Sequence, residues 1–215
     1  GDLVTHMGVG DLYGLNQQHR TALLPVPTEA ELAECVKRKA SITKKAVANF
    51  EIMPIHCACI NPTYGKTILE MMLTQLGPAA EDMCKDSEQR TLVHYAAVCE
   101  SEEPLEVLLT QGFSPHRIDS NSMTPLMYAC MANRPKNVAR LLAAKADPLV
   151  RSSERTSFHL SVQQGSAEAL KALVSHMATL AAEMPPPVKG KKGGKKPKPS
   201  WQLATSSSQR TALHD

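Results

Sequence analysis

The sequence contains few aromatic residues and no long apolar run. Aromatic side chains make up 4% of the 215 residues, and Trp201 is the single tryptophan. Leucine, alanine, valine and methionine must therefore fill the core, as they do where helices pack on helices. No stretch of 18 or more apolar residues occurs, so the sequence predicts no membrane-spanning helix and no membrane partner. The first residues also lack the basic and apolar regions of a secretory signal.

The common signatures of enzymes are absent as well. Gly190-Lys191-Lys192 lacks the preceding glycine of a phosphate-binding loop, and Gly8-Val9-Gly10 lacks the third glycine of a dinucleotide fingerprint. No Gly-x-Ser-x-Gly elbow occurs. Because no constellation of catalytic groups is present, we expect neither catalysis nor a cofactor in this segment.

Positive charge is concentrated in one short segment. The formal net charge is +3, but the chain outside that segment has 18 basic and 21 acidic residues. The segment holds six lysines with no acidic residue among them: Lys189, Lys191, Lys192, Lys195, Lys196 and Lys198. Because residues 184–205 are rich in Pro, Gly and Lys, we expect a disordered insertion there. It is a solvated loop, a nuclear import signal, or an arm that makes weak contacts with nucleic acid.

The cysteines suggest core residues more than a metal site. The six are Cys35, Cys57, Cys59, Cys84, Cys99 and Cys130. Cys57-x-Cys59 beside His56 resembles half of a zinc site, but such a site needs four ligands, and no second pair follows at a suitable spacing. We therefore expect reduced, buried thiols and no metal. With no secretory signal, we also expect an intracellular protein, cytoplasmic or nuclear.

One pattern recurs along the chain with a nearly constant period. Its four complete copies begin at Met53, Thr91, Thr124 and Thr156, and the first interval is the widest. Each copy starts with a tetrad close to Thr-Pro-Leu-His, continues with small residues and leads to a second apolar stretch such as Leu105–Leu109. Threonine caps helices and proline suits their first position, so each copy predicts two helices. One pair cannot bury its apolar face alone, so the copies must stack.

These features resemble the ankyrin-repeat family, whose unit is a short hairpin, two antiparallel helices and a loop. The period, the tetrad, the small residues behind it and the paired leucines of the second helix all match. The resemblance implies an all-α ankyrin-repeat solenoid with short β-hairpin loops over residues 48–183. A fifth start, Arg210-Thr211-Ala212-Leu213-His214, implies a further, truncated repeat over 206–215, so we expect the chain to be part of a longer protein.

Two departures from the family pattern affect the loops. The turn glycine that precedes each tetrad is replaced by Glu51, Gln89, Ser122 and Glu154. These residues tolerate a positive φ less well than glycine does. The first two copies are also separated by a few extra residues, and we expect these in loops, where added length has little cost.

Histidine recurs in the tetrads, as His56, His94 and His159, while Met127 replaces it in the third copy. The resemblance implies that this histidine forms hydrogen bonds which tie the tetrad to its neighbour. We expect no metal or catalysis here, because histidines about one repeat apart lie too far from one another to share an ion.

The first 47 residues fit the pattern less clearly. Pro27-Thr28-Glu29-Ala30-Glu31 predicts a helix start with a capping box. Thr21-Ala22-Leu23 lies one period before the copy that begins at Met53, and it echoes the fifth start. Prolines at 25 and 27, however, would break the first helix of a repeat in that register. The segment is thus a degenerate leading repeat, a helical cap or the tail of a preceding unit.

The resemblance also implies where partners bind. In the family, the variable positions at the hairpin tips lie on one continuous concave surface that binds proteins or peptides. We therefore expect a non-catalytic interaction scaffold with these positions exposed. On this sequence they are Phe50, Ile52, Ser87, Glu88, Arg90, Ser120, Asn121, Met123, Ser152, Ser153 and Arg155.

Two other interpretations stay open. In the first, the whole chain is the targeting arm of a multidomain enzyme, such as a tankyrase-like poly(ADP-ribose) polymerase, which transfers ADP-ribose from NAD+. Catalysis would then lie outside these 215 residues. Alternatively, it is an adaptor that contacts nucleic acid or an import receptor through residues 189–198.

Overall fold

The computed structural model describes residues 17–24, 28, 30–31, 33, 42–46, 49–77 and 79–183. The chain divides into two compact units, residues 1–177 and 178–215, and of the second only the end of one helix is described. The described secondary structure is helical, apart from an isolated bridge between Ser152 and Arg155. The predicted all-α class is therefore confirmed.

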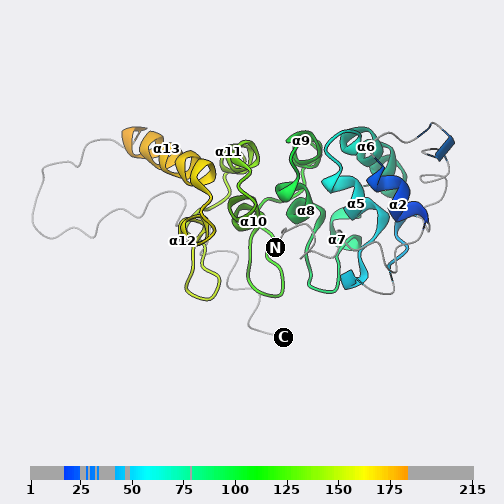
Figure 1. Ribbon diagram of the computed structural model, residues 1–215, viewed down its shortest axis with the longest axis horizontal. Helices are drawn as coiled ribbons and strands as arrows, with labels where there is room; N and C mark the ends of the chain where they lie inside the picture. The colour runs from blue at the N-terminus through cyan, green and yellow to red at the C-terminus, as the bar shows by residue number, and fades with distance from the viewer. Residues whose placement is uncertain are drawn as a thin grey trace, which may run out of the picture. The chain divides into compact units, whose positions relative to one another are not determined.

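From residue 54 onward the described helices, apart from the short α7 (Ala80–Met83), form four successive pairs, which we number as the first to fourth repeats. The first helices of the pairs form the lower row in Figure 1 and have seven residues each: α5 (Pro54–Ile60), α8 (Leu92–Val98), α10 (Pro125–Met131) and α12 (Ser157–Gln163). The second helices form the upper row: α6 (Gly65–Leu76), α9 (Glu103–Thr110), α11 (Pro135–Ala143) and α13 (Ala167–Glu183).

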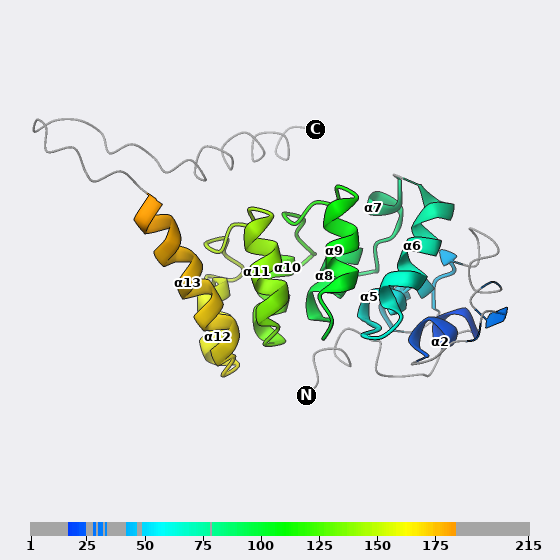
Figure 2. The ribbon, with the colours of Figure 1, turned by 90° about the horizontal axis from the view of Figure 1, so that it is seen from above.

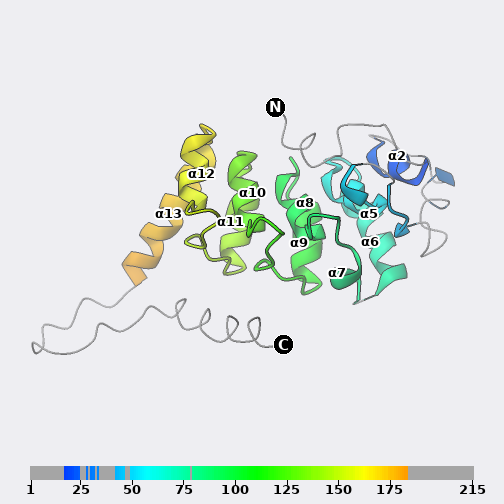
Figure 3. The same ribbon diagram turned by 90° about the horizontal axis from the view of Figure 1, so that it is seen from below.

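The core lies between neighbouring repeats as well as within each pair. Leu92 and Leu126 of the first helices, and Leu105 and Leu108 of α9, are fully buried. The small residues that follow each tetrad, such as Ala96, are buried too, and they let the first helices approach one another. Figure 3 shows α8, α10 and α12 side by side, and Figure 2 shows α6, α9 and α11 in the same relation.

Gly65 permits a close approach at the start of α6. A Cβ atom added there would lie 2.7 Å from the carbonyl oxygen of Ala58 in α5 and 3.0 Å from Cγ of Pro104 in α9. The first of these distances is shorter than the contacts that Cβ atoms make in proteins. The first and second repeats therefore meet at a point where only glycine fits without a shift of the backbone.

The extra residues between the first two copies lie partly in helices. The chain from the start of α6 to the start of α8 is longer than the corresponding stretches from α9 to α10 and from α11 to α12. The prediction that the extra residues lie in loops is therefore incomplete. They lengthen α6 to 12 residues, against 8 in α9 and 9 in α11, and they add the short helix α7 (Ala80–Met83).

Helix α2 (Gln17–Leu23) precedes the first repeat and packs against α5. Its seven residues match the length of the other first helices, and it ends before Pro25. His19 Nε2 lies 2.9 Å from the carbonyl oxygen of Ile52, and His94 Nε2 makes the same kind of contact with Met123, at 3.1 Å. This arrangement favours the interpretation of the segment as a degenerate leading repeat. His19 would then correspond to the tetrad histidine, and the tetrad would not begin at Thr21.

The predicted capping box near residue 28 is present. The backbone N–H of Thr28 donates to Glu31 Oε2 at 2.8 Å, and the N–H of Glu31 donates to Thr28 Oγ1 at 3.3 Å. The lysine segment, the rest of the predicted insertion at 184–205, and the predicted repeat start at 206–215 lie outside the described residues. None of the described helices is long and apolar enough to cross a membrane.

Candidate partner-binding surface

Four tight turns precede the first helices of the four repeats, and those before α8, α10 and α12 project to the same side in Figure 1. We call them the hairpin ladder: residues 49–52, 86–90, 119–123 and 152–155. In the last three turns, a backbone hydrogen bond runs from the first residue to the last: Asp86 N to Arg90 O at 3.2 Å, Asp119 N to Met123 O at 3.0 Å, and Ser152 N to Arg155 O at 2.8 Å.

The four positions at which the family's turn glycine is replaced all have left-handed backbone conformations. Their φ angles are 55° at Glu51, 60° at Gln89, 59° at Ser122 and 65° at Glu154. A left-handed conformation costs a residue with a side chain about 1–2 kcal/mol. The turn geometry of the family is thus retained without the glycine, and each turn is strained.

Hydrogen bonds join the tips of successive turns. The N–H of Ser87 donates to the carbonyl of Phe50 at 2.8 Å, and the N–H of Ser120 donates to the carbonyl of Glu88 at 2.9 Å. Ser152 Oγ donates to the carbonyl of Asn121 at 2.6 Å. A surface built in this way is already ordered, so a partner that binds it meets little cost in conformational entropy.

Buried aspartates hold the second and third turns from within. Asp86 Oδ1 accepts from the backbone N–H groups of Glu88 and Arg90, at 2.9 and 2.8 Å, and Oδ2 accepts from Tyr95 Oη at 2.6 Å. Asp119 and Tyr128 repeat the arrangement, with an oxygen–oxygen distance of 2.7 Å. Burial raises the pKa of both tyrosines above the ordinary value. Sequence analysis missed these pairs, although both have the spacing Asp-x8-Tyr.

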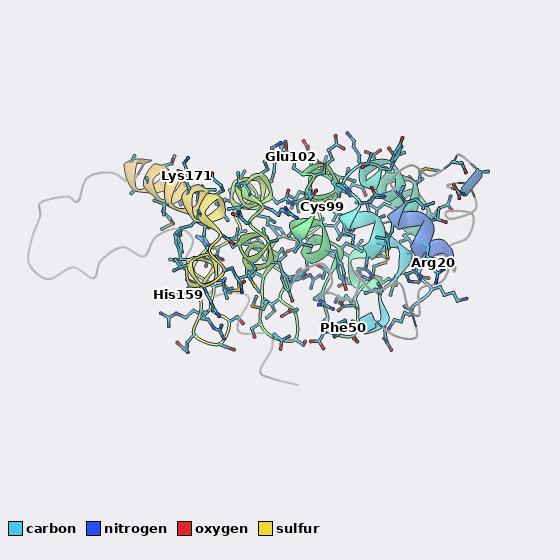
Figure 4. All side chains as sticks on the ribbon, viewed as in Figure 1. Arg20, Phe50, Cys99, Glu102, His159 and Lys171 are labelled. Atoms are coloured by element: carbon cyan, nitrogen blue, oxygen red, sulfur yellow. The ribbon has the colours of Figure 1, made fainter. Side chains whose placement is uncertain are left out.

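The predicted partner-binding residues divide into exposed and buried groups. Side chains that are exposed or partly exposed are those of Phe50, Ser87, Glu88, Ser120, Asn121, Met123, Ser153 and Arg155. Figure 4 shows Phe50 on the lower side, with the turns, and Glu102 and Lys171 on the opposite side.

The expectation of exposure is wrong for Ile52, Arg90 and Ser152. Ile52 is 0% exposed and belongs to the apolar core. Arg90 is 3% exposed because its guanidinium pairs with Asp86 beneath Phe50. Ser152 is buried by its hydrogen bond to the preceding turn. These three side chains shape the turns from inside.

The recurring histidines form structural hydrogen bonds, as the resemblance implies. Nδ1 of His56 accepts from the N–H of Met53 at 2.9 Å, and Nδ1 of His94 accepts from the N–H of Thr91 at 3.1 Å. The opposite ring nitrogen of His94 donates to Met123 O, and that of His56 lies 3.3 Å from Cys84 O. Burial lowers the pKa of His56 and of His94 to about 4.

The described cysteines are buried and carry thiols, not disulfides. Burial raises the pKa of Cys99 and of Cys130 to about 11, so both remain protonated at neutral pH. Among the residues that the structure describes, no three His, Cys, Asp or Glu side chains are placed to hold a metal ion together.

Similar proteins were found by comparison of the sequence. Residues 102–184 match the family model described as ankyrin repeats (3 copies). Relatives include protein lin-12 of Caenorhabditis elegans, 26% identical over 63% of this chain, and the B-cell lymphoma 3 protein homolog of Mus musculus, 27% identical over 60%. A putative ankyrin repeat protein of fowlpox virus, FPV223, is 28% identical over 42% of the chain.

The chain spans only 8%, 30% and 63% of the lengths of these three relatives. None of the three is named as a poly(ADP-ribose) polymerase, so they give no support to the tankyrase-like interpretation. The matched family is one of repeat modules, not of enzymes. Its match, together with the four stacked helix pairs and their turns, shows that the chain is an ankyrin-repeat protein.

Proposed function

We propose that the chain is a non-catalytic scaffold that binds protein or peptide partners through the exposed side chains of the hairpin ladder. The observation that carries this proposal is the set of hydrogen bonds between successive turns, which joins four separate tips into one ordered strip. The match to ankyrin repeats, which generally act as protein-interaction modules, supports the same conclusion.

The side chains along the strip differ from turn to turn. The first turn presents an aromatic ring, Phe50, the second a carboxylate, Glu88, the third an amide, Asn121, and the fourth a guanidinium, Arg155. In the last three turns the fold needs little from these side chains, because backbone hydrogen bonds join the ends of each turn. A strip of varied groups on a fixed backbone can distinguish one partner from another.

The test is selection of peptides of about 12 residues from a displayed library, followed by affinity measurement with variants. Replacing Asn121, Met123 and Arg155 together with alanine should lower the affinity for the selected peptides about tenfold or more, because a few interface residues, often arginines, carry most of the binding energy. The thermal unfolding midpoint should fall only slightly, because of these three side chains Met123 alone packs partly against the core.

The control is a second triple change on the opposite side, at the exposed residues Glu106, Lys136 and Lys171. That variant should bind the selected peptides as well as the unsubstituted chain does. If the control loses binding and the ladder variant keeps it, the partner surface lies on the second helices and the proposal is wrong.

For the lysine segment, outside the described residues, we propose a secondary role: salt-sensitive attraction of nucleic acid, or nuclear import inside the cell. Deleting residues 189–198 should leave peptide affinity at physiological salt nearly unchanged and should abolish retention on heparin. Loss of peptide binding after this deletion would instead assign the site to the segment.

A further inference from the structure

The first and second turns of the hairpin ladder meet in a contact between Phe50 and Arg90. The ring of Phe50 lies over the guanidinium of Arg90, with 4.7 Å between Cζ and the ring centroid. Tyr95 lies on Arg90 as well, with Cζ 5.6 Å from its ring centroid. A cation held between two aromatic rings is well placed, but the contact leaves two features unexplained.

The first unexplained feature is the backbone of Phe50. Its φ and ψ angles are 59° and 25°, a left-handed conformation that is uncommon for a bulky residue. Phe50 is nevertheless 40% exposed, so this strained position presents an apolar side chain to solvent. Such strain persists where the surroundings enforce it and is often found at functional sites.

The second unexplained feature is a nitrogen atom of Arg90. Nε pairs with Asp86 Oδ2, and the guanidinium also interacts with Tyr128. Nη2, however, has no hydrogen-bond partner of good geometry among the described residues and no contact with solvent. A buried donor without an acceptor is costly, and native proteins contain few of them. Phe50 covers this guanidinium, so a shift of the Phe50 side chain would expose a donor that is ready to bind an acceptor.

We propose that Phe50 and Arg90 form a subsite for an uncharged, apolar segment of a partner peptide; this rests on the proposed function. An apolar side chain of the peptide packs on the exposed face of the Phe50 ring. The ring tilts, and a backbone carbonyl oxygen of the peptide accepts a hydrogen bond from Arg90 Nη2.

The charges around the subsite favour a neutral acceptor over a carboxylate. Asp86 already balances the charge of Arg90 through their ion pair. The turns that flank the subsite add two further carboxylates, Glu51 and Glu88, and of these Glu51 pairs with Lys45 while Glu88 accepts from neutral groups of the third turn. An acidic peptide would therefore meet net repulsion, whereas a peptide carbonyl would not.

The experiment uses the whole chain and peptides of about 12 residues selected from a displayed library. Phe50→Asn removes the ring, and asparagine tolerates the left-handed backbone, so the turn should persist. We expect Phe50→Asn to lower the affinity for the selected peptides about tenfold or more without lowering the unfolding midpoint. Placing Glu on both sides of the apolar residue in a selected peptide should also lower the affinity of that peptide for the chain. Ile118→Ala, which truncates an exposed apolar residue outside the ladder, should leave affinity unchanged.

A direct readout is the NMR signal of the Arg90 side chain, which should shift when the peptide binds, because Nη2 gains an acceptor. Arg90→Met, which copies Met123 at the equivalent position of the third turn, should also weaken binding if it folds. Equal affinity of the selected peptides for Phe50→Asn, an unmoved Arg90 signal, or enrichment of acidic peptides would each overturn the subsite.

The outcomes separate this proposal from the proposed function. If the ladder variant at Asn121, Met123 and Arg155 loses binding while Phe50→Asn keeps it, the ladder binds partners but the subsite is wrong. If neither variant weakens binding, or if no peptide is enriched, both proposals fail.

Discussion

The second and third repeats differ from the fourth in how far their first helices are covered. Ala97 and Cys130 are completely buried, whereas Val162, at the same position in the fourth repeat, is 66% exposed. Among the second helices, Leu142 is 3% exposed and its equivalent Val174 is 53% exposed. The residues are apolar in each case, and no helix pair follows α13 in the described part of the chain. The comparison teaches that the following repeat, more than the residue itself, decides burial.

The largest expected effect is on core packing in the second repeat. Leu108→Ala should lower the free energy of unfolding by about 2–5 kcal/mol, because Leu108 is fully buried. In the third repeat, Leu142→Ala, at the position equivalent to Val174, should have an effect in the same range because Leu142 is 3% exposed. Val174→Ala, in the fourth repeat, should change the free energy of unfolding by less than about 0.5 kcal/mol, as surface substitutions do. Denaturant unfolding followed by circular dichroism measures these changes, and equal losses for Leu142→Ala and Val174→Ala would contradict the comparison.

The next effect is the pH dependence that the buried histidines impose. Burial holds the pKa of His56 and of His94 at about 4 in the folded chain, against about 6.5 when unfolded. The unfolded chain therefore binds more protons between these values, so stability is complete above about pH 6.5 and declines as pH falls toward 4. Each histidine contributes on the order of 3 kcal/mol to this decline.

Geometry explains the direction. A proton added at Nδ1 of His94 would face the N–H of Thr91 from which this atom now accepts a hydrogen bond. His94→Met, which copies Met127 of the third repeat, should reduce the loss of stability between pH 7 and 5, measured by denaturant unfolding. An unchanged slope would mean that His94 is not the group that titrates.

The smallest expected effect on stability comes from backbone strain in the turns, and it should be the same in the inner repeats and in the last one. Gln89→Gly and Glu154→Gly should each raise the free energy of unfolding by up to about 1 kcal/mol, because glycine adopts a positive φ freely. Lys171→Gly, in the exposed face of α13, should lower it by about 1 kcal/mol. A gain at only one of the two turns would show that neighbouring repeats influence turn strain as well.

The sequence was sufficient for features that depend on local pattern. The period of the tetrads located the four helix pairs, and threonine or proline marked where the first helices begin. The missing glycines pointed to the four turn positions that have positive φ. These signals are local because caps, turns and apolar spacing are read over a few residues.

Features that depend on the folded chain were not predicted. Arg90 was expected at the surface because the family resemblance places it at a hairpin tip, but Asp86 and Tyr95 surround it only after the turn has closed. The place of α2 was not predicted either, because the residues around His19 keep only the histidine of the Thr-Pro-Leu-His tetrad. The lengthened α6 could not be distinguished from a longer loop by residue counts alone.

Contacts between repeats are often made by a side chain of one repeat and a backbone carbonyl of its neighbour. Nδ2 of Asn137 reaches the carbonyls of Ala96, Ala97 and Cys99, at 2.9–3.2 Å, and Nδ2 of Asn61 reaches those of Ala22 and Leu24. Every amino acid carries such a carbonyl, so the accepting residue can change identity while the bond survives. Copies of the unit can therefore diverge in sequence after duplication and still fit beside one another.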